Sequence, residues 1–201
     1  MSIIPKSLEA QGNRSWRVTT QPVIEPITVE YLKLFARVDG DEEDELLASF
    51  IKTARTMMEQ YLGRALIHQT ITLNMDHWPG MIINLPRPPL ISITSVNTLD
   101  EDDTATEYDS SYYYAITTSE PGQLVIRMGY TPPINSAREY GGYQVVYLAG
   151  YGSGTTSVPQ PIRDGIAIWA TDIYDNRKMS DEPPEYVKSI VQSYRIPPMV
   201  Y

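Results

Sequence analysis

The sequence predicts an α+β fold, with helical segments near both ends and a β-rich middle. Apolar residues recur every three or four positions in residues 42–62 and 159–178, which is the spacing of amphipathic helices. Across residues 69–149, short runs of alternating apolar and polar residues are separated by proline and glycine, as in strands joined by turns. The 201 residues are enough for one domain with a hydrophobic core and extensions.

The N-terminal part is expected to be an extended arm followed by a short helix. Residues 1–26 show no clear periodicity and contain three prolines, so we expect an arm that packs on its own domain or on a neighbour. Thr28 is a suitable cap for a helix over residues 28–38, because its hydroxyl can accept a hydrogen bond from a free amide of the first turn.

The helix over residues 42–62 has the clearest periodicity. Asp41 is its expected N-cap, and the acidic residues of the first turn favour the positive end of the helix dipole. Gly63 is suited to a left-handed C-cap. We expect this helix and the helix over residues 159–178 to form a shared core from Leu46, Phe50, Met57, Tyr61, Ile162, Ile166, Trp169 and Ile173.

Six strands are expected within residues 69–149. In residues 70–75, Ile71, Leu73 and Met75 alternate with polar residues, which predicts one buried face. The acidic segment 99–108 is expected to form a hairpin tip in solvent, and Pro121-Gly122 is expected to form a turn. The other five strand sequences are MIINL, LISITSV, YYYAIT, QLVIRM and YQVVYLA.

Residues 179–201 are interpreted as a docking tail, with a short helix through about Tyr194 and an apolar, proline-stiffened end. An exposed apolar segment is unfavourable unless something covers it, and proline lowers the entropy lost when a segment is ordered on a partner. Packing on its own domain is the alternative. The expected partner-binding residues are Tyr186, Ile190, Tyr194, Arg195, Ile196, Pro197, Pro198, Met199, Val200 and Tyr201.

The composition disfavours several classes of protein. The net charge is −9 and the basic residues are scattered, whereas DNA binding through phosphates needs clustered Lys and Arg. The chain has no cysteine, which excludes disulfides and thiolate metal sites and fits synthesis in a reducing cytosol. We see neither a signal peptide nor an apolar run of the roughly 20 residues needed to cross a membrane.

The loop YLAGYGSGTTSV has a glycine pattern that resembles a phosphate-binding loop. It lacks the lysine of a P-loop, and Gly150, Gly152 and Gly154 do not have the spacing of a dinucleotide-binding loop. Ser153 is not in the G-x-S-x-G frame of a nucleophilic serine. We therefore expect a turn between a strand and a helix.

The other candidate sites also favour ordinary structure. The acidic residues 39–45 do not match a calcium loop and suit a helix N-terminus, and residues 100–103 suit a solvated hairpin tip. His68 and His77 have no metal-ligand spacing and belong to no visible triad. The sequence thus predicts no cofactor, no metal and no catalytic residue.

Six segments occur in a distinctive order: ITVEYLKLFARVD, DGDEEDELLASFIKTARTMMEQYLGRALI, QTITLNMDHWP, INLPRPPLISITSV, VVYLAGYG and VPQPIRDGIAIWATDIYDNR. Their order and spacing, over residues 27–178, resemble the head–tail connector (adaptor) proteins of tailed bacteriophages and gene-transfer particles. The resemblance implies a structural virion protein in which the N- and C-terminal helices form a helical bundle and a β-rich insertion lies between them. It leaves the role of residues 1–26 open.

The resemblance also implies location and partners. Such a protein is made in the host bacterial cytoplasm and forms a homo-oligomeric ring, expected to be a dodecamer, in the virion neck. The expected partners are the portal protein, on which residues 186–201 would dock, and a stopper or tail-terminator protein. DNA would pass through the channel without specific binding, for which an acidic wall is suited. A truncation after Met179 is expected to leave a folded subunit that no longer attaches to the portal.

Two alternatives stay open from the sequence. One is another tail or baseplate interaction module whose β-rich region binds a partner, which would be a stable monomer without affinity for the portal. The other is a hydrolase or metal-dependent enzyme that uses the acidic loops. It would bind divalent cations tightly or lose activity on mutation of Asp41 or Asp102.

Overall fold

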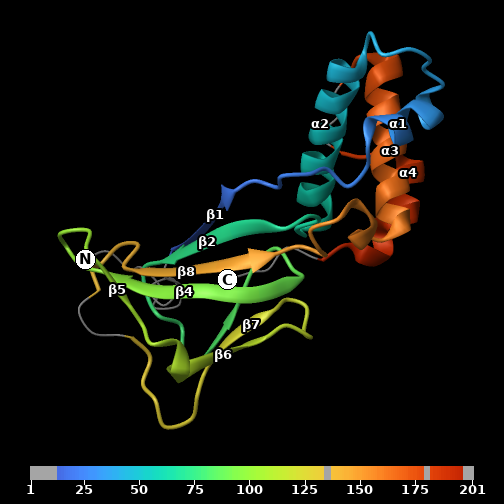
Figure 1. Ribbon diagram of the computed structural model, residues 1–201. Coiled ribbons are helices and arrows are strands. Elements are labelled where there is room, and N and C mark those ends of the chain that lie inside the picture. The colour runs from blue at the N-terminus through green and yellow to red at the C-terminus, as the bar shows by residue number, and fades with distance from the viewer. Residues whose placement is uncertain (1–12, 134–136, 179–181, 197–201) are drawn as a thin grey trace, which may run out of the picture. The chain divides into compact units, whose positions relative to one another are not determined.

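The computed structural model describes residues 13–133, 137–178 and 182–196, which form two compact units (Figure 1). The β unit contains the described residues up to Gln21 together with Gln69–Ala149. The helical unit contains Pro22–His68 together with the described residues from Gly150 onward. The chain therefore combines helices with antiparallel sheets, which confirms the predicted mixture of α and β structure.

Four α-helices lie in the helical unit, within the residues that the structure describes. They are α1 (Val29–Ala36), α2 (Asp44–Leu62), α3 (Gln160–Asn176) and α4 (Glu185–Val191). The first three lie within one or two residues of the predicted ranges. Thr28 caps α1 as expected, because its Oγ1 accepts a hydrogen bond from the Tyr31 amide at 3.2 Å.

The two ends of α2 give different outcomes. Gly63 has the left-handed conformation of the expected C-cap, with φ +69°. The prediction of Asp41 as N-cap is wrong, since the residue at that position is Glu43, which makes no side-chain capping bond. Asp41 lies two residues before the N-cap, where its carboxylate forms an ion pair with Lys33 of α1, at 3.0 Å, in place of a bond to the helix amides.

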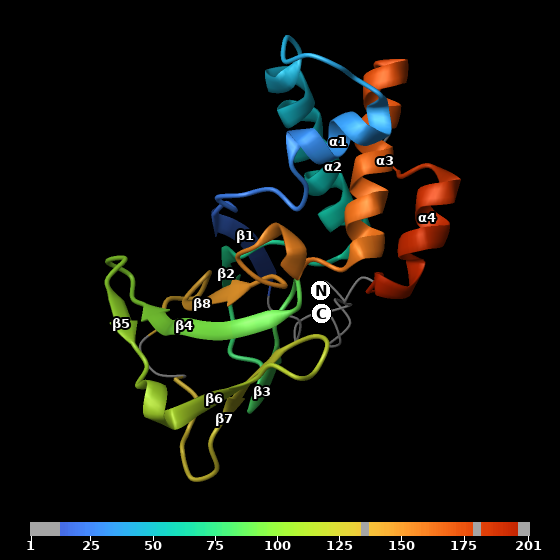
Figure 2. The same ribbon diagram turned by 45° about the vertical axis from the view of Figure 1, so that its right-hand side comes forward.

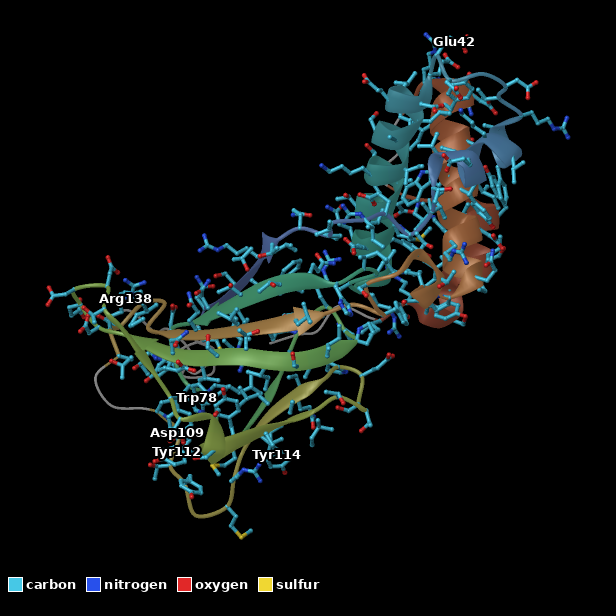
Figure 3. All side chains as sticks on the ribbon, in the orientation of Figure 1. Glu42, Trp78, Asp109, Tyr112, Tyr114 and Arg138 are labelled. Atoms are coloured by element: carbon cyan, nitrogen blue, oxygen red, sulfur yellow. The ribbon has the colours of Figure 1, made fainter. Side chains whose placement is uncertain are left out.

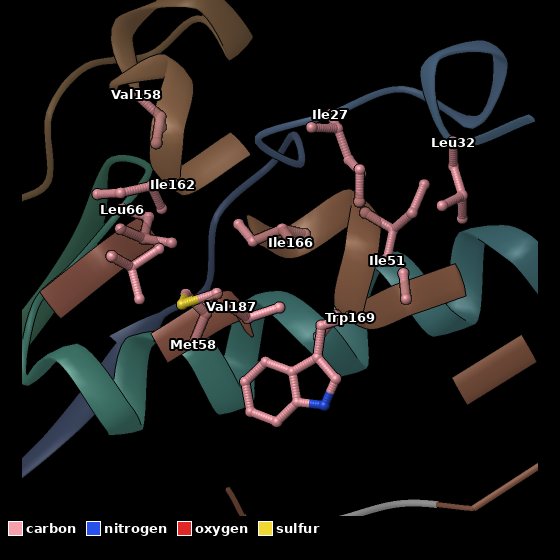
Figure 4. Packing of buried hydrophobic residues seen from close by; sticks show 14 of the residues in the cluster. Ile27, Leu32, Ile51, Met58, Leu66, Val158, Ile162, Ile166, Trp169 and Val187 are labelled. Carbon is pink, nitrogen blue, oxygen red and sulfur yellow. The ribbon is translucent and has the colours of Figure 1, made fainter. Parts of the chain in front are cut away.

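The helices share one hydrophobic core, part of which Figure 4 shows around Trp169 and Met58. The prediction for α3 is confirmed, because Ile162, Ile166, Trp169 and Ile173 are all buried. The prediction for α2 is confirmed in part, because Phe50, Met57 and Tyr61 are half-buried and pack against the core, whereas Leu46 is 42% exposed. The fully buried row lies one residue further around the helix and consists of Leu47, Ile51, Ala54, Met58 and Leu62.

The β unit contains two antiparallel sheets, seen as separate layers in Figure 2. One sheet has five strands in the order β1-β2-β8-β4-β5, and the other has three in the order β3-β7-β6. All six predicted strands are present, and β1 and β5 are additional. The bounds are β1 (Arg14–Thr20), β2 (Gln69–Met75), β3 (Ile82–Asn84), β4 (Leu90–Leu99), β5 (Ala105–Glu107), β6 (Tyr113–Ile116), β7 (Gln123–Ile126) and β8 (Tyr143–Ala149).

The pairing of β2 explains both its alternation and the added strand. Ile71, Leu73 and Met75 are buried as predicted, and they lie opposite alternate residues of β8. On its other side β2 pairs with β1, so that Trp16 lies opposite Leu73. Residues 14–20 were expected to belong to an extended arm, and they pack on their own chain as an edge strand.

Candidate docking surfaces

The glycine-rich loop after β8 is a structural turn, as predicted. Gly150 has a φ of +126°, and a Cβ atom there would lie 2.5 Å from the carbonyl oxygen of Ile67. The loop also pairs with segment 66–68, since the His68 amide donates to the Gly152 carbonyl at 3.1 Å. The glycines therefore allow close backbone approach between two segments of the helical unit, and this approach explains their pattern.

The acidic runs form surface and ion pairs. Lys33 contacts both Asp41 and Asp44, and Asp103 at the β4–β5 hairpin pairs with Arg138, which Figure 3 labels. Within the described ranges, no three His, Cys, Asp or Glu side chains are grouped so that they could hold a metal ion. None of the helices described is both long and apolar enough to pass through a bilayer.

Helix α4, in the predicted docking tail, belongs to the core of the helical unit. Val187 and Val191 are fully buried. Gly165 of α3 allows α4 to approach closely, because a Cβ atom there would lie only 3.0 Å from Val191 Cγ1. A truncation after Met179 would remove both valines from the core. We therefore expect such a truncation to destabilise the helical unit, in place of the intact subunit expected from the sequence.

The opposite face of α4 is open. Tyr186 and Ile190, four residues apart and so on one side of the helix, are 51% and 37% exposed. Tyr186 borders a groove of about 240 Å³. Partial burial, and then the carboxylate of Asp172, raise the pKa of the tyrosine. The groove is lined by Phe35, Ile168, Thr171, Asp172, Asp175 and Tyr186.

The residues after α4 pack on the end of α2. Tyr194 is half-buried against the core, and the guanidinium carbon of Arg195 lies 4.7 Å from the centre of the Tyr61 ring. The Ile196 amide donates to the Leu62 carbonyl at 2.9 Å. These three contacts hold the last described residues against α2. The remaining predicted tail residues, Pro197, Pro198, Met199, Val200 and Tyr201, lie outside the described residues.

A second groove is lined by Leu46, Phe50 and Ile173, three of the residues that the sequence predicted to lie in the core. It has a volume of about 220 Å³ and is mostly apolar. Phe50 contacts Tyr174 edge to face there, with ring centres 6.4 Å apart. The apolar stripe on α2 is two adjacent rows wide instead of one. This width is the sequence feature that could have indicated that one of the two rows faces outward. The groove is lined by Leu46, Phe50, Ile173, Tyr174 and Arg177.

The comparison with protein families identifies the chain. The family model for head completion proteins matches residues 25–166, which is well over half of the sequence. The chain belongs to the head completion protein family. Its members are structural proteins of virions and not enzymes, so the grooves described above are candidate binding surfaces and not active sites. No curated protein matches the sequence.

Three solved structures share the fold at 18% sequence identity. The first is a chain from the virion of a native gene transfer agent particle, with a TM-score of 0.77. The others come from the neck of an empty particle computed with C6 symmetry (0.75) and the neck of a native particle computed with C12 symmetry (0.72). Each match covers 92% of this chain and 97% of the other chain.

Proposed function

We propose that this head completion protein is a head–tail connector (adaptor) that forms a ring in the virion neck, under the portal protein. The observation that carries the proposal is the likeness, over almost the whole of both chains, to a chain from a particle neck computed with C12 symmetry. A dodecamer fits that symmetry. The ring would extend the DNA channel and join the head to a stopper or tail-terminator protein.

The proposed architecture is a helical bundle from the N- and C-terminal helices with a β-rich insertion between them. Residues 27–178 would be the connector domain, residues 1–26 its N-terminal segment and residues 179–201 the docking tail. An acidic ring of chains with net charge −9 would let DNA pass without gripping its phosphates.

The C-terminal end is the proposed portal contact. Tyr186 and Ile190 are available to a partner, because Val187 and Val191 hold α4 in the core and turn these two side chains outward. The contacts of Tyr194, Arg195 and Ile196 then fix the starting point of residues 197–201. Their sequence, PPMVY, combines stiff prolines with apolar side chains, which suits docking into a groove of the portal.

Mass photometry of the purified protein, alone and with portal rings of the same particle, tests the proposal. We expect saturation at one copy per portal subunit. Removal of residues 197–201, or Tyr186→Ala combined with Ile190→Ala, should weaken this binding without unfolding the chain. The control is Tyr140→Ala, since Tyr140 is 71% exposed and belongs to the β unit. Absence of portal binding by the wild-type chain at any salt concentration would refute the connector function.

A second candidate function is a tail or baseplate interaction module. It is favoured by exposed apolar side chains of the β unit, such as Ile82 and Met128, which are 56% and 97% exposed. A module of this kind would stay a stable monomer in the presence of portal rings and would bind another tail protein through the β unit.

A further inference from the structure

Strand pairing produces an apolar row on one face of the three-stranded sheet. Ile82 and Tyr114 both lie opposite Val125, so the three side chains share a face. Ile82 and Tyr114 are 56% and 40% exposed, whereas Ile83 and Leu124 on the other face are buried. One face of this sheet therefore contributes to the core of the β unit. The other is exposed at its two outer strands, while Val125 on the central strand is only 8% exposed.

The loop after β7 extends this row and is held in place. The guanidinium carbon of Arg127 lies 5.2 Å from the centre of the Tyr114 ring, and Met128 is almost fully exposed. The Tyr130 ring stacks on the ring of Tyr112, which Figure 3 labels, with ring centres 4.4 Å apart, and this contact holds the loop in place. We call this surface the sheet-face patch, and it consists of Ile82, Tyr114, Arg127 and Met128.

The chemistry of the sheet-face patch indicates a protein partner with carboxylates. Tyr, Met and Arg are the residues enriched at protein–protein interfaces, and the patch contains no acidic residue. Arg127 makes no ion pair with another described residue. A single arginine is too little for DNA, whose binding requires several phosphate contacts. A carboxylate of an acidic protein surface would complement the charge of Arg127, which lies over the Tyr114 ring.

The chain itself carries a suitable acidic element at the β4–β5 turn. Asp100 Oδ1 accepts hydrogen bonds from the amides of Asp102 (3.0 Å) and Thr104 (2.8 Å), which fix the turn. Asp103 is occupied by its ion pair with Arg138. Glu101 and Asp102 remain exposed and make no ion pair within the described structure. The hairpin tip thus presents two carboxylates on a preformed turn.

We infer that the sheet-face patch binds the β4–β5 hairpin tip of a second copy of this chain, with Glu101 and Asp102 facing Arg127. The two surfaces are different, so the contact is heterologous and can repeat from copy to copy until a ring closes. Charge complementarity at this point also offsets the repulsion between chains of net charge −9. The inference rests on the proposed ring and names the contact that joins its subunits.

Disulfide trapping tests the contact directly, because the natural chain has no cysteine. A tagged Asp102→Cys chain and an untagged Met128→Cys chain are mixed, assembled on portal rings and oxidised. The mixed disulfide pair should exceed either same-variant pair severalfold. The control replaces Met128→Cys by Ser15→Cys, on the exposed part of β1, and should give no excess of the mixed pair.

Charge reversal provides the second test. Arg127→Glu should weaken association between copies about tenfold, and adding Glu101→Lys and Asp102→Lys should restore it. Arg17→Glu, the same charge change at an exposed residue of β1, should have no effect. If the wild-type chain saturates portal rings but neither test shows the expected result, the inference is wrong and the connector function stands. If the wild-type chain neither binds portal nor self-associates at high concentration, both are wrong.

Discussion

Replacing the buried valines of α4 tests whether the C-terminal helix belongs to the core. Val187 and Val191 have no exposed surface. Each change to alanine removes two carbon atoms, at about 0.8 kcal/mol for each buried group, or about 1.6 kcal/mol of transfer free energy. The cavity that remains raises the expected loss to about 2–3 kcal/mol of unfolding free energy per site. For the double variant we expect about 4–5 kcal/mol, a large part of a typical domain's stability.

The assay is urea unfolding followed by circular dichroism, with Ile190→Ala as the matched control. Ile190 lies on the same helix, and its replacement brings a similar gain in helix propensity, so this effect cancels in the comparison. Because Ile190 is 37% exposed, its loss should cost less than about 1 kcal/mol. If the valine variants unfold at the same urea concentration as Ile190→Ala, α4 is not part of the core and residues 179–201 are a free tail.

Two further predictions concern buried contacts of the helical unit. Gly150→Ala should lower the free energy of unfolding by about 1–3 kcal/mol, because the residue has a positive φ and an added Cβ would lie 2.5 Å from the Ile67 carbonyl oxygen. Gly154→Ala should change it by less than about 0.5 kcal/mol, because its added Cβ would make only ordinary van der Waals contacts with Ser157 and Thr156. Thermal unfolding of the two variants checks this, and equal melting temperatures would contradict it. Arg55→Met should cost about 3–5 kcal/mol in urea unfolding, because it removes the buried guanidinium that forms ion pairs with both Glu25 and Glu59. Lys52→Met, one turn away on the exposed side of α2, should be nearly neutral, and a similar loss in both variants would show that the ion pairs contribute little.

The candidate surfaces show where sequence reasoning stops. The apolar stripe of α2 has two adjacent rows, and periodicity cannot tell which of them meets α3. Packing in the helical unit buries Leu47 and Ile51 and leaves Leu46 and Phe50 beside a groove. In the same way, the tail sequence indicates an amphipathic segment. Only its packing separates the core residue Val187 from the exposed Tyr186.

The sequence by itself determined the local structure of this protein. Alternation in residues 70–75, helical periodicity in residues 42–62, the Thr28 cap and the Gly63 cap all depend on neighbours a few positions away, so they can be read from the chain. The tertiary structure alone decided what depends on distant residues. Residues 14–20 became a strand because β2 offers them an unpaired edge, and the apolar row of Ile82 and Tyr114 exists because strand register places both opposite Val125. Docking surfaces combine residues that are far apart in the sequence, and local sequence patterns do not show which of these residues lie together.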